Sequence, residues 1–401
     1  MTFRVAQRLA DLPPPATIAM AQRARALKAE GVDVISLALG EPDFPSPPEA
    51  VEAAYAAGRA GDTRYPPVDG TIALKDAVIA KFRRDNGLDY ARNQILIANG
   101  GKQIIFDAFM ATLDPGDEVI VPAPYWVSYP LIAQMMGAVP VPVACQETDG
   151  FRLRPDALKA VLSPRTRWLV LNFPSNPTGA VMGPDDLAAI AEILRAYPDV
   201  LVLSDEIYEH LTFGDRVHAS LAAVAPDLAD RILTLNGVAK AYAMTGWRVG
   251  FAGGPAPLIA AMAKVQGNAT SGVCTLAQAG AVAALNGDQS RIASMRDTYA
   301  RRRDQVVGAL RAIPGITCAN PDGAFYAYPG IAALIGRTTP GGLVIDTDVT
   351  FAQTLLEEAH VSTVPGTAFG VSPHLRLSIA ASDDQLASAL DRISSFVAKL
   401  R

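Results

Sequence analysis

The sequence contains few cysteines and histidines, and this scarcity argues against several kinds of site. Its 401 residues include four histidines and three cysteines, Cys145, Cys274 and Cys318. The cysteines are far apart and odd in number, which fits a reducing compartment and gives no disulfide or metal pattern. No two histidines have the spacing of metal ligands, so we expect no metal site.

Long apolar runs and an excess of positive charge are also missing. No run approaches the roughly 18 residues that cross a bilayer, and the N-terminus lacks the features of a signal peptide. The net charge is −5, which argues against nucleic-acid or membrane partners. We expect the short cluster Arg301-Arg302-Arg303 to lie on a solvated helix face. Half of the residues are hydrophobic, enough for a large core, and the sequence predicts a cytoplasmic globular protein.

From about residue 70 onward, short apolar runs alternate with longer helical patterns. The runs are almost entirely aliphatic, as in strands buried on both faces of a parallel sheet, and they cover 95–97, 118–121, 168–171, 200–203 and 232–235. In such sheets ligands bind at the carboxyl ends of the strands. The notable polar residues follow these runs: Gly100, Gly101, Lys102, Asn172, Asp205 and Lys240.

The pattern changes after about residue 290. A long helical stretch leads to short β-rich runs at 323–328 and 375–379 and to a last helix from about 383. We predict a large α/β domain over 46–290 and a small α+β domain over 291–401, which the N-terminal arm, 1–45, helps to complete. No strand is followed by the dinucleotide glycine pattern, which disfavours a Rossmann oxidoreductase.

One segment places a lysine eight residues before an arginine, directly after the run 232–235. A lysine held at the end of a buried strand, as Lys240 is, can bond covalently to a carbonyl cofactor. An arginine close by, here Arg248, can bind a phosphate through two parallel hydrogen bonds. A lone lysine in a loop is usually solvated, but the residues around this one favour the chemical role.

This segment, which reads Asn236-Gly237-Val238-Ala239-Lys240-Ala241-Tyr242-Ala243-Met244-Thr245-Gly246-Trp247-Arg248-Val249-Gly250, resembles the cofactor-lysine segment of the class I aminotransferases. The likeness is greatest to the bacterial aspartate aminotransferase subgroup and extends over nearly the whole chain. It implies the type I fold of enzymes that use pyridoxal 5'-phosphate (PLP), in which a large domain with a mostly parallel sheet carries a smaller α+β domain. It also implies that PLP bonds to Lys240.

The resemblance assigns further contacts to the cofactor ring. Asp205 would face the ring nitrogen and keep it protonated, because a nearby negative charge raises the pKa of a base. Tyr208 would donate to the ring hydroxyl, and Trp126 would stack on the ring. Asn176 would contact the ring oxygen and the substrate carboxylate.

A second group of residues would hold the cofactor phosphate. Gly101 and Lys102 begin a predicted helix, where backbone N–H groups and the helix dipole bind anions. Arg248 would bind the same phosphate. Tyr65 resembles the tyrosine that reaches the phosphate in the neighbouring subunit, which implies a homodimer with shared active sites.

The sequence and the resemblance also indicate residues that would contact the substrate. Arg376 interrupts an apolar strand, and a buried arginine is costly unless an anion meets it. The resemblance makes it a clamp on the α-carboxylate, over which the backbone of Gly40 closes. Lys102 and Thr17 would contact the distal group of an acidic substrate.

Two regions depart from the aspartate-specific pattern. The segment Pro13-Pro14-Pro15-Ala16-Thr17 stands where relatives usually have Lys-Pro-Ser-x-Thr, and 268–275 lacks the usual Ser-Thr-Ser-Asn-Pro-Thr-Ser. Both regions help to recognise the distal group in aspartate-specific members. An acidic substrate is therefore supported by Lys102 and opposed by these two regions.

The resemblance implies a PLP-dependent aminotransferase with ping-pong kinetics and small-molecule substrates. The leading pair is aspartate as donor and 2-oxoglutarate as acceptor. Aromatic amino acids, prephenate, alanine and basic amino acids stay open as alternatives, and so does a lyase or decarboxylase of the same fold. A PLP-binding regulator is the remaining alternative, although only about 30 residues precede the catalytic core.

Overall fold

The computed structural model describes residues 4–10, 12 and 16–401, and its centre is a seven-stranded sheet. The strand order is β2-β8-β7-β6-β5-β3-β4, and β8 alone runs antiparallel to its neighbours. The strands span β2 Ile95–Ala98, β3 Glu118–Ala123, β4 Val139–Ala144, β5 Thr166–Asn172, β6 Leu201–Asp205, β7 Ile232–Gly237 and β8 Gly250–Gly253. The mostly parallel α/β sheet predicted from the apolar runs is confirmed.

Helices cover both faces of this sheet, as the aliphatic runs require. One face packs against α5 (Gly101–Thr112), α6 (Ser128–Met135) and α10 (Ala256–Ala269). The other face packs against α4 (Ile72–Lys81), α7 (Pro155–Val161), α8 (Pro184–Arg195), α9 (Leu221–Val224) and α11 (Thr275–Asn286). Alternate residues of one strand enter opposite cores: Leu169 joins the second face and Val170 the first.

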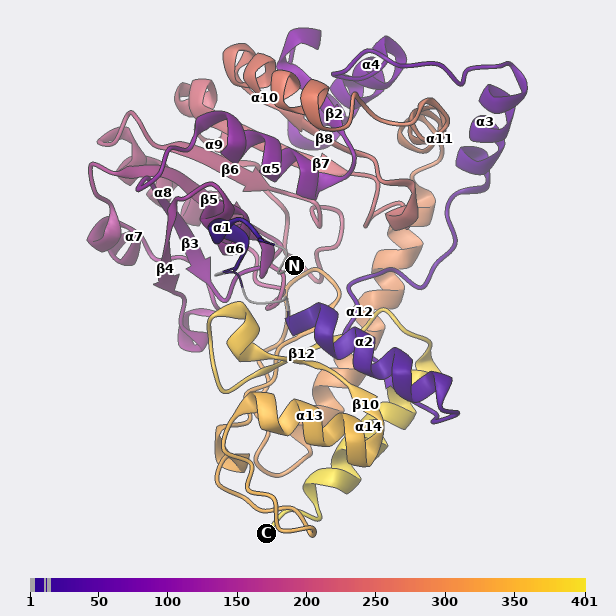
Figure 1. Cartoon of the computed structure of the whole chain (residues 1–401), viewed down its shortest axis with the longest axis vertical. Coiled ribbons are helices and arrows are strands. Elements are labelled where there is room, and N and C mark those ends of the chain that lie inside the picture. The colour runs from indigo at the N-terminus through magenta and orange to yellow at the C-terminus, as the bar shows by residue number, and fades with distance from the viewer. Residues whose placement is uncertain (1–3, 11, 13–15) are drawn as a thin grey trace.

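A separate hydrophobic cluster forms the lower lobe in Figure 1. It joins α2 (Ala16–Ala29) near the N-terminus to α13 (Asp348–Ala359) and α14 (Asp383–Val397) near the C-terminus. Two small sheets complete it, β1 (Ile35–Ser36) with β10 (Val361–Ser362), and β11 (Val364–Pro365) with β12 (Leu375–Ser378) and β9 (Tyr326–Ala327). The boundaries 1–45, 46–290 and 291–401 stay a prediction, which limited proteolysis would test.

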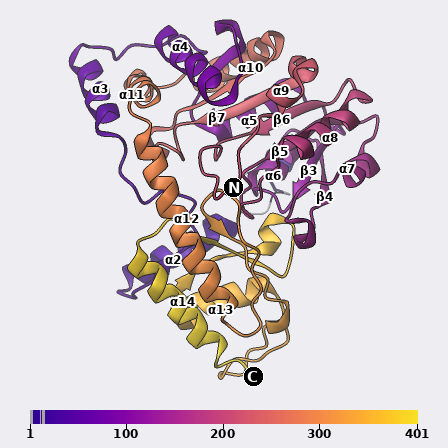
Figure 2. The ribbon, with the colours of Figure 1, turned by 180° about the vertical axis from the view of Figure 1, so that it is seen from behind.

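The long helix α12 (Ser290–Arg311) connects the two lobes, as Figure 2 shows. The remaining α-helices in the described part of the chain are α1 (Gln7–Ala10) and α3 (Pro48–Arg59). Among the described residues, no helix has the length and apolar character needed to cross a membrane.

The helix α12 corrects one expectation, because Arg302 does not lie on a solvated face. Its side chain is 8% exposed, and its Nη1 and Nε lie 2.9 and 2.8 Å from carboxylate oxygens of Asp43 and Asp383. Arg301 is exposed as expected, whereas the Arg303 side chain is 12% exposed and lies over the ring of Phe213. Two carboxylates from distant parts of the chain offset the cost of burying the Arg302 charge.

Candidate active site

A cavity of about 500 Å³ lies where the two lobes meet, at the carboxyl ends of the central strands. Its lining brings together nearly all of the predicted site residues: Gly40, Gly101, Lys102, Trp126, Asn176, Asp205, Tyr208, Lys240, Arg248 and Arg376. Such a position is where ligands bind in open α/β sheets. The chain thus gathers residues more than 300 positions apart around one space.

Lys240 lies three residues beyond β7, and its amine points into the site. Its Nζ donates a hydrogen bond of 2.5 Å to the carbonyl oxygen of Gly40. Burial, followed by the charge of Arg376, lowers the pKa of Lys240 to about 8. An amine with this pKa is partly neutral near physiological pH and can act as a nucleophile or a base.

Gly40 is required at this point because a side chain would not fit. A Cβ there would lie 2.1 Å from the hydroxyl oxygen of Tyr326. That hydroxyl shares a 2.8 Å hydrogen bond with the hydroxyl of Tyr208, and both tyrosines are buried. The glycine therefore lets the 40–44 segment close over Lys240 and the two tyrosines.

Asp205 ends β6, and its carboxylate has donors on both oxygens. The Tyr129 hydroxyl donates to Oδ2 at 2.6 Å, and the Ile207 N–H donates to Oδ1 at 3.2 Å. Burial raises the pKa of Asp205 to about 6, while the Tyr129 hydrogen bond opposes that rise. A buried carboxylate with so few partners is suited to meet a positively charged ring nitrogen.

The N-terminus of α5 forms a cradle for an anion together with Arg248. Gly100 precedes the helix with φ 85°, and a Cβ on it would lie 2.5 Å from Nη2 of Arg248. The guanidinium is held by the carbonyl oxygens of Thr245 and Asn99, at 3.0 and 3.3 Å. Helix N–H groups and a fixed guanidinium are the donors that a phosphate needs.

Arg376 lies on β12 and is 3% exposed. Its Nη1 donates to Oδ1 of Asn176 at 2.9 Å, and its Nη2 donates to the carbonyl oxygen of Ala38 at 2.6 Å. Its buried Nε has no hydrogen-bond partner among the described residues. A buried guanidinium with an unused donor and no carboxylate partner within the described chain is suited to an anionic ligand.

Lys102 and Trp126 lie side by side in the lining. The Lys102 Nζ is 5.1 Å from the centre of the indole ring. Burial, and then the charge of Arg248, lowers the pKa of Lys102. Neither residue has a carboxylate neighbour in the described part of the chain, so the Lys102 charge is available to a ligand.

Two predicted site residues, Tyr65 and Thr17, are not among the described residues that line the cavity. Tyr65 is 92% exposed and is not part of this cavity, so its role depends on a second subunit and stays a prediction. Thr17 lies in α2, but its side chain is outside the described residues, as is the segment 13–15.

The structure adds residues that the sequence reasoning missed. Tyr129 forms a hydrogen bond with Asp205, and Tyr326 forms one with Tyr208. Arg25 and Glu41 line the cavity. No local pattern in the sequence marks these four residues, because the residues that they meet in the site lie far away in the chain.

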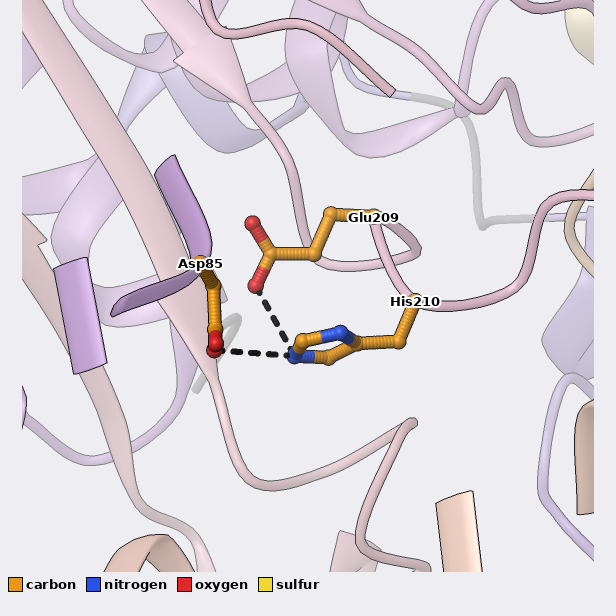
Figure 3. Close-up of side chains that lie close together, drawn as sticks. All are labelled: Asp85, Glu209 and His210. Atoms are coloured by element: carbon orange, nitrogen blue, oxygen red, sulfur yellow. Dashed lines mark ion pairs between the residues drawn. The ribbon is translucent and has the colours of Figure 1, made fainter. Parts of the chain in front are cut away.

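A second polar cluster, formed by Asp85, Glu209 and His210, lies outside the lining of this cavity (Figure 3). The His210 Nε2 lies 3.4 Å from Asp85 and 3.2 Å from Glu209. Lys81 already pairs with Glu209, and Arg84 pairs with Asp85 at 2.6 Å. These cations satisfy the carboxylates, so the cluster is explained as an internal ion network.

Comparisons with known proteins agree with this site. Residues 32–393 match the family model of class I and II aminotransferases. The chain is 50% identical to the aspartate/prephenate aminotransferase of Cereibacter sphaeroides, over 98% of each sequence. It is 47% identical to the aspartate aminotransferase of Rhizobium meliloti, over 98% of this chain and 96% of the relative.

Solved structures give the same result. The crystal structure of the aspartate aminotransferase from Rhizobium meliloti superposes with a TM-score of 0.97, at 46% identity over the full length of both chains. The Thermus thermophilus aspartate aminotransferase with maleate gives 0.91, at 40% identity, over 98% of this chain and all of the other. The predicted fold and family are confirmed: the chain belongs to the class I and II aminotransferases, enzymes that use pyridoxal 5'-phosphate to transfer an amino group from an amino acid to a 2-oxo acid.

Proposed function

We propose that this aminotransferase takes its amino group from aspartate and passes it to 2-oxoglutarate. The observation that carries this proposal is the charge of the cavity. Five cationic side chains line it (Arg25, Lys102, Lys240, Arg248 and Arg376) against two carboxylates (Glu41 and Asp205). Such an excess of positive charge favours ligands with several negative charges, as a cofactor phosphate and a dicarboxylic substrate together have.

The residues fit the cofactor on three independent counts. Gly100, Gly101 and Arg248 offer donors for its phosphate, and Asp205 offers a buried carboxylate for its ring nitrogen. Lys240 supplies the amine for its aldehyde. When bound, the cofactor supplies an electron-withdrawing ring that makes the Cα–H bond of the amino acid acidic.

The chain's own residues then perform the remaining work. Arg376 and Asn176, already joined by a hydrogen bond, orient the α-carboxylate of the substrate. Lys240 accepts the proton from the substrate Cα at its Nζ and later returns it, because its lowered pKa suits both roles. Asp205 would stabilise positive charge on the cofactor ring, the Tyr208 hydroxyl would donate to the ring oxygen, and Trp126 would pack on the ring.

The relatives support the substrate assignment, since their names specify aspartate and, for several, prephenate. Prephenate is therefore the second candidate, as an acceptor. It also carries a carboxylate beyond its oxo-acid group, so the same cavity charge favours it. We further propose a homodimer, in which Tyr65 of each chain, with its 92% exposed side chain, completes the partner's phosphate site. The cytoplasmic location stays a prediction.

A half-reaction panel tests the substrate assignment. The PLP-loaded protein is mixed with single amino acids, and loss of the bound aldehyde form of the cofactor is followed by absorbance. We expect rapid conversion with aspartate and glutamate. Conversion only with aromatic, neutral or basic amino acids would overturn the substrate assignment, and ammonia and pyruvate without an acceptor would indicate a lyase. Return of the amino form by prephenate would establish the second acceptor.

A further inference from the structure

The helix α2 contributes one charged side chain to the active-site cavity. Ala21 and Arg25 are four residues apart, so they lie on the same face of the helix, and both line the cavity. Ala21 is buried and small, whereas Arg25 is exposed. The neighbouring Arg23 lies on another face and pairs with Glu357 at 2.6 Å. Among the described side chains of α2, Arg25 is therefore the one hydrogen-bond donor that lines the cavity.

The charge of Arg25 is not neutralised by the cavity's own carboxylates. Asp205 is buried and accepts from Tyr129, and Glu41 accepts from the Thr245 hydroxyl. Arg25 makes no ion pair within residues 4–10, 12 and 16–401, in contrast to Arg23. An exposed arginine fork that meets no carboxylate among the described residues is suited to bind a ligand carboxylate with two hydrogen bonds.

The proposed function already assigns three of the five cavity cations. Arg248 binds the phosphate, Arg376 the α-carboxylate, and Lys240 the cofactor aldehyde. Lys102 and Arg25 remain, while a dicarboxylic substrate has one further carboxylate. The sequence from Leu12 to Pro15 carries no side-chain donor, and Arg25 is the arginine of α2 that lines the cavity.

We propose that Arg25 is a specificity-determining residue, which binds the distal carboxylate of dicarboxylic substrates together with Lys102. This rests on the proposed function, because it requires a substrate with two carboxylates. Arg25 acts on substrate choice and not on the chemical step, since its side chain is exposed and, among the described residues, forms no hydrogen bond or ion pair with Lys240 or Asp205.

The test compares Arg25→Gln with a matched control, Arg23→Gln, which changes the same residue type on the same helix away from the cavity. Half-reaction kcat/KM is measured with aspartate and with alanine, which has no distal carboxylate. A hydrogen bond to a charged group is worth about 1.5–3 kcal/mol, so we expect Arg25→Gln to lower kcat/KM for aspartate by about 10- to 100-fold. We expect about the same value as wild type for alanine, and Arg23→Gln to keep the wild-type ratio. Arg25→Lys, which keeps the charge, should recover part of the loss.

An unchanged aspartate-to-alanine ratio in Arg25→Gln, with active wild-type protein, would overturn the role of Arg25 alone. Equal losses with both amino acids would also overturn it, because they indicate a structural or cofactor effect. Failure of the wild-type protein to convert aspartate or glutamate would overturn the proposed function and this inference with it.

Discussion

The hydroxyl of Tyr129 donates a 2.6 Å hydrogen bond to Oδ2 of Asp205, and both side chains are buried beneath the cavity. This bond links α6 to the end of β6 and stabilises the ionised form of the carboxylate. The same arrangement holds the carboxylate in one orientation. Because Asp205 is the proposed partner of the cofactor ring nitrogen, Tyr129 is a positioning residue for catalysis.

Tyr129→Phe should therefore lower activity without abolishing it. Loss of a hydrogen bond to a charged group costs about 1.5–3 kcal/mol, so we expect kcat to fall by about 10- to 100-fold with a smaller change in KM. The matched control is Tyr125→Phe, since within the described chain the Tyr125 hydroxyl forms no hydrogen bond. Steady-state kinetics with aspartate would decide, and equal behaviour of the two variants would contradict the assignment.

Asp205→Asn should raise the stability of the cofactor-free protein and lower the turnover of the enzyme. The folded protein holds the Asp205 proton more tightly than the unfolded chain, because burial raises the pKa to about 6 from 3.8. Ionised Asp205 thus lowers the stability of the cofactor-free protein by about 3 kcal/mol at neutral pH, and this cost disappears as the pH falls below about 4.

The neutral amide removes that cost. We expect Asp205→Asn to raise the free energy of unfolding of the cofactor-free protein near pH 7.5, with little gain at about pH 4. Turnover with cofactor should fall by about 100-fold or more, as when a preorganised charge partner is removed. Urea unfolding at both pH values checks the first part; a variant less stable than wild type near pH 7.5 would refute it.

The lowered pKa of Lys240 predicts how the cofactor binds. Only the neutral amine attacks an aldehyde, so the rate of covalent PLP attachment should rise with pH and level off above about 8. An ordinary lysine would level off near 10.5. Rapid-mixing absorbance across this range measures the profile, and Lys240→Ala is the control that should show no attachment. A rate that still rises tenfold per pH unit above 9 would falsify the lowered pKa.

Much of the site could be predicted because it follows strand ends. Asp205, Asn176 and Lys240 come after buried aliphatic runs, and parallel strands bring their carboxyl ends to one edge. Arg376 was found because a charge in an apolar strand requires an explanation. The resemblance to a family supplied the roles, which strand positions alone do not give.

The rest could not be predicted because its contacts join distant segments. The Tyr129–Asp205 and Tyr208–Tyr326 bonds span 76 and 118 residues, and no local pattern marks them. The strand β8, Gly250–Gly253, is half glycine and becomes a strand because β7 and β2 bond to both of its edges. Tertiary pairing here outweighs a weak local preference for strand.

Arg302 is another residue whose surroundings are decided by contacts with distant segments. Three arginines in a row predicted a solvated face, but Asp43 and Asp383 approach Arg302 from segments far away in sequence. Because Asp43 belongs to the 40–44 segment that closes over Lys240, this ion pair connects α12 to the active site. Removing one partner of a buried pair leaves the other charge without compensation.

Arg302→Gln should lower the free energy of unfolding by about 2–4 kcal/mol, somewhat less than for a fully buried pair because the Asp383 side chain is 49% exposed. The control is Arg301→Gln, whose pair with Asp383 lies at the surface and is worth about 0–1 kcal/mol. We also expect a higher KM for Arg302→Gln, since a loosened 40–44 segment would hold Gly40 less firmly over the substrate carboxylate. Urea unfolding and half-reaction kinetics measure the two effects. Equal stability of the two variants would show that the Arg302 ion pairs contribute no more to stability than the surface pair of Arg301.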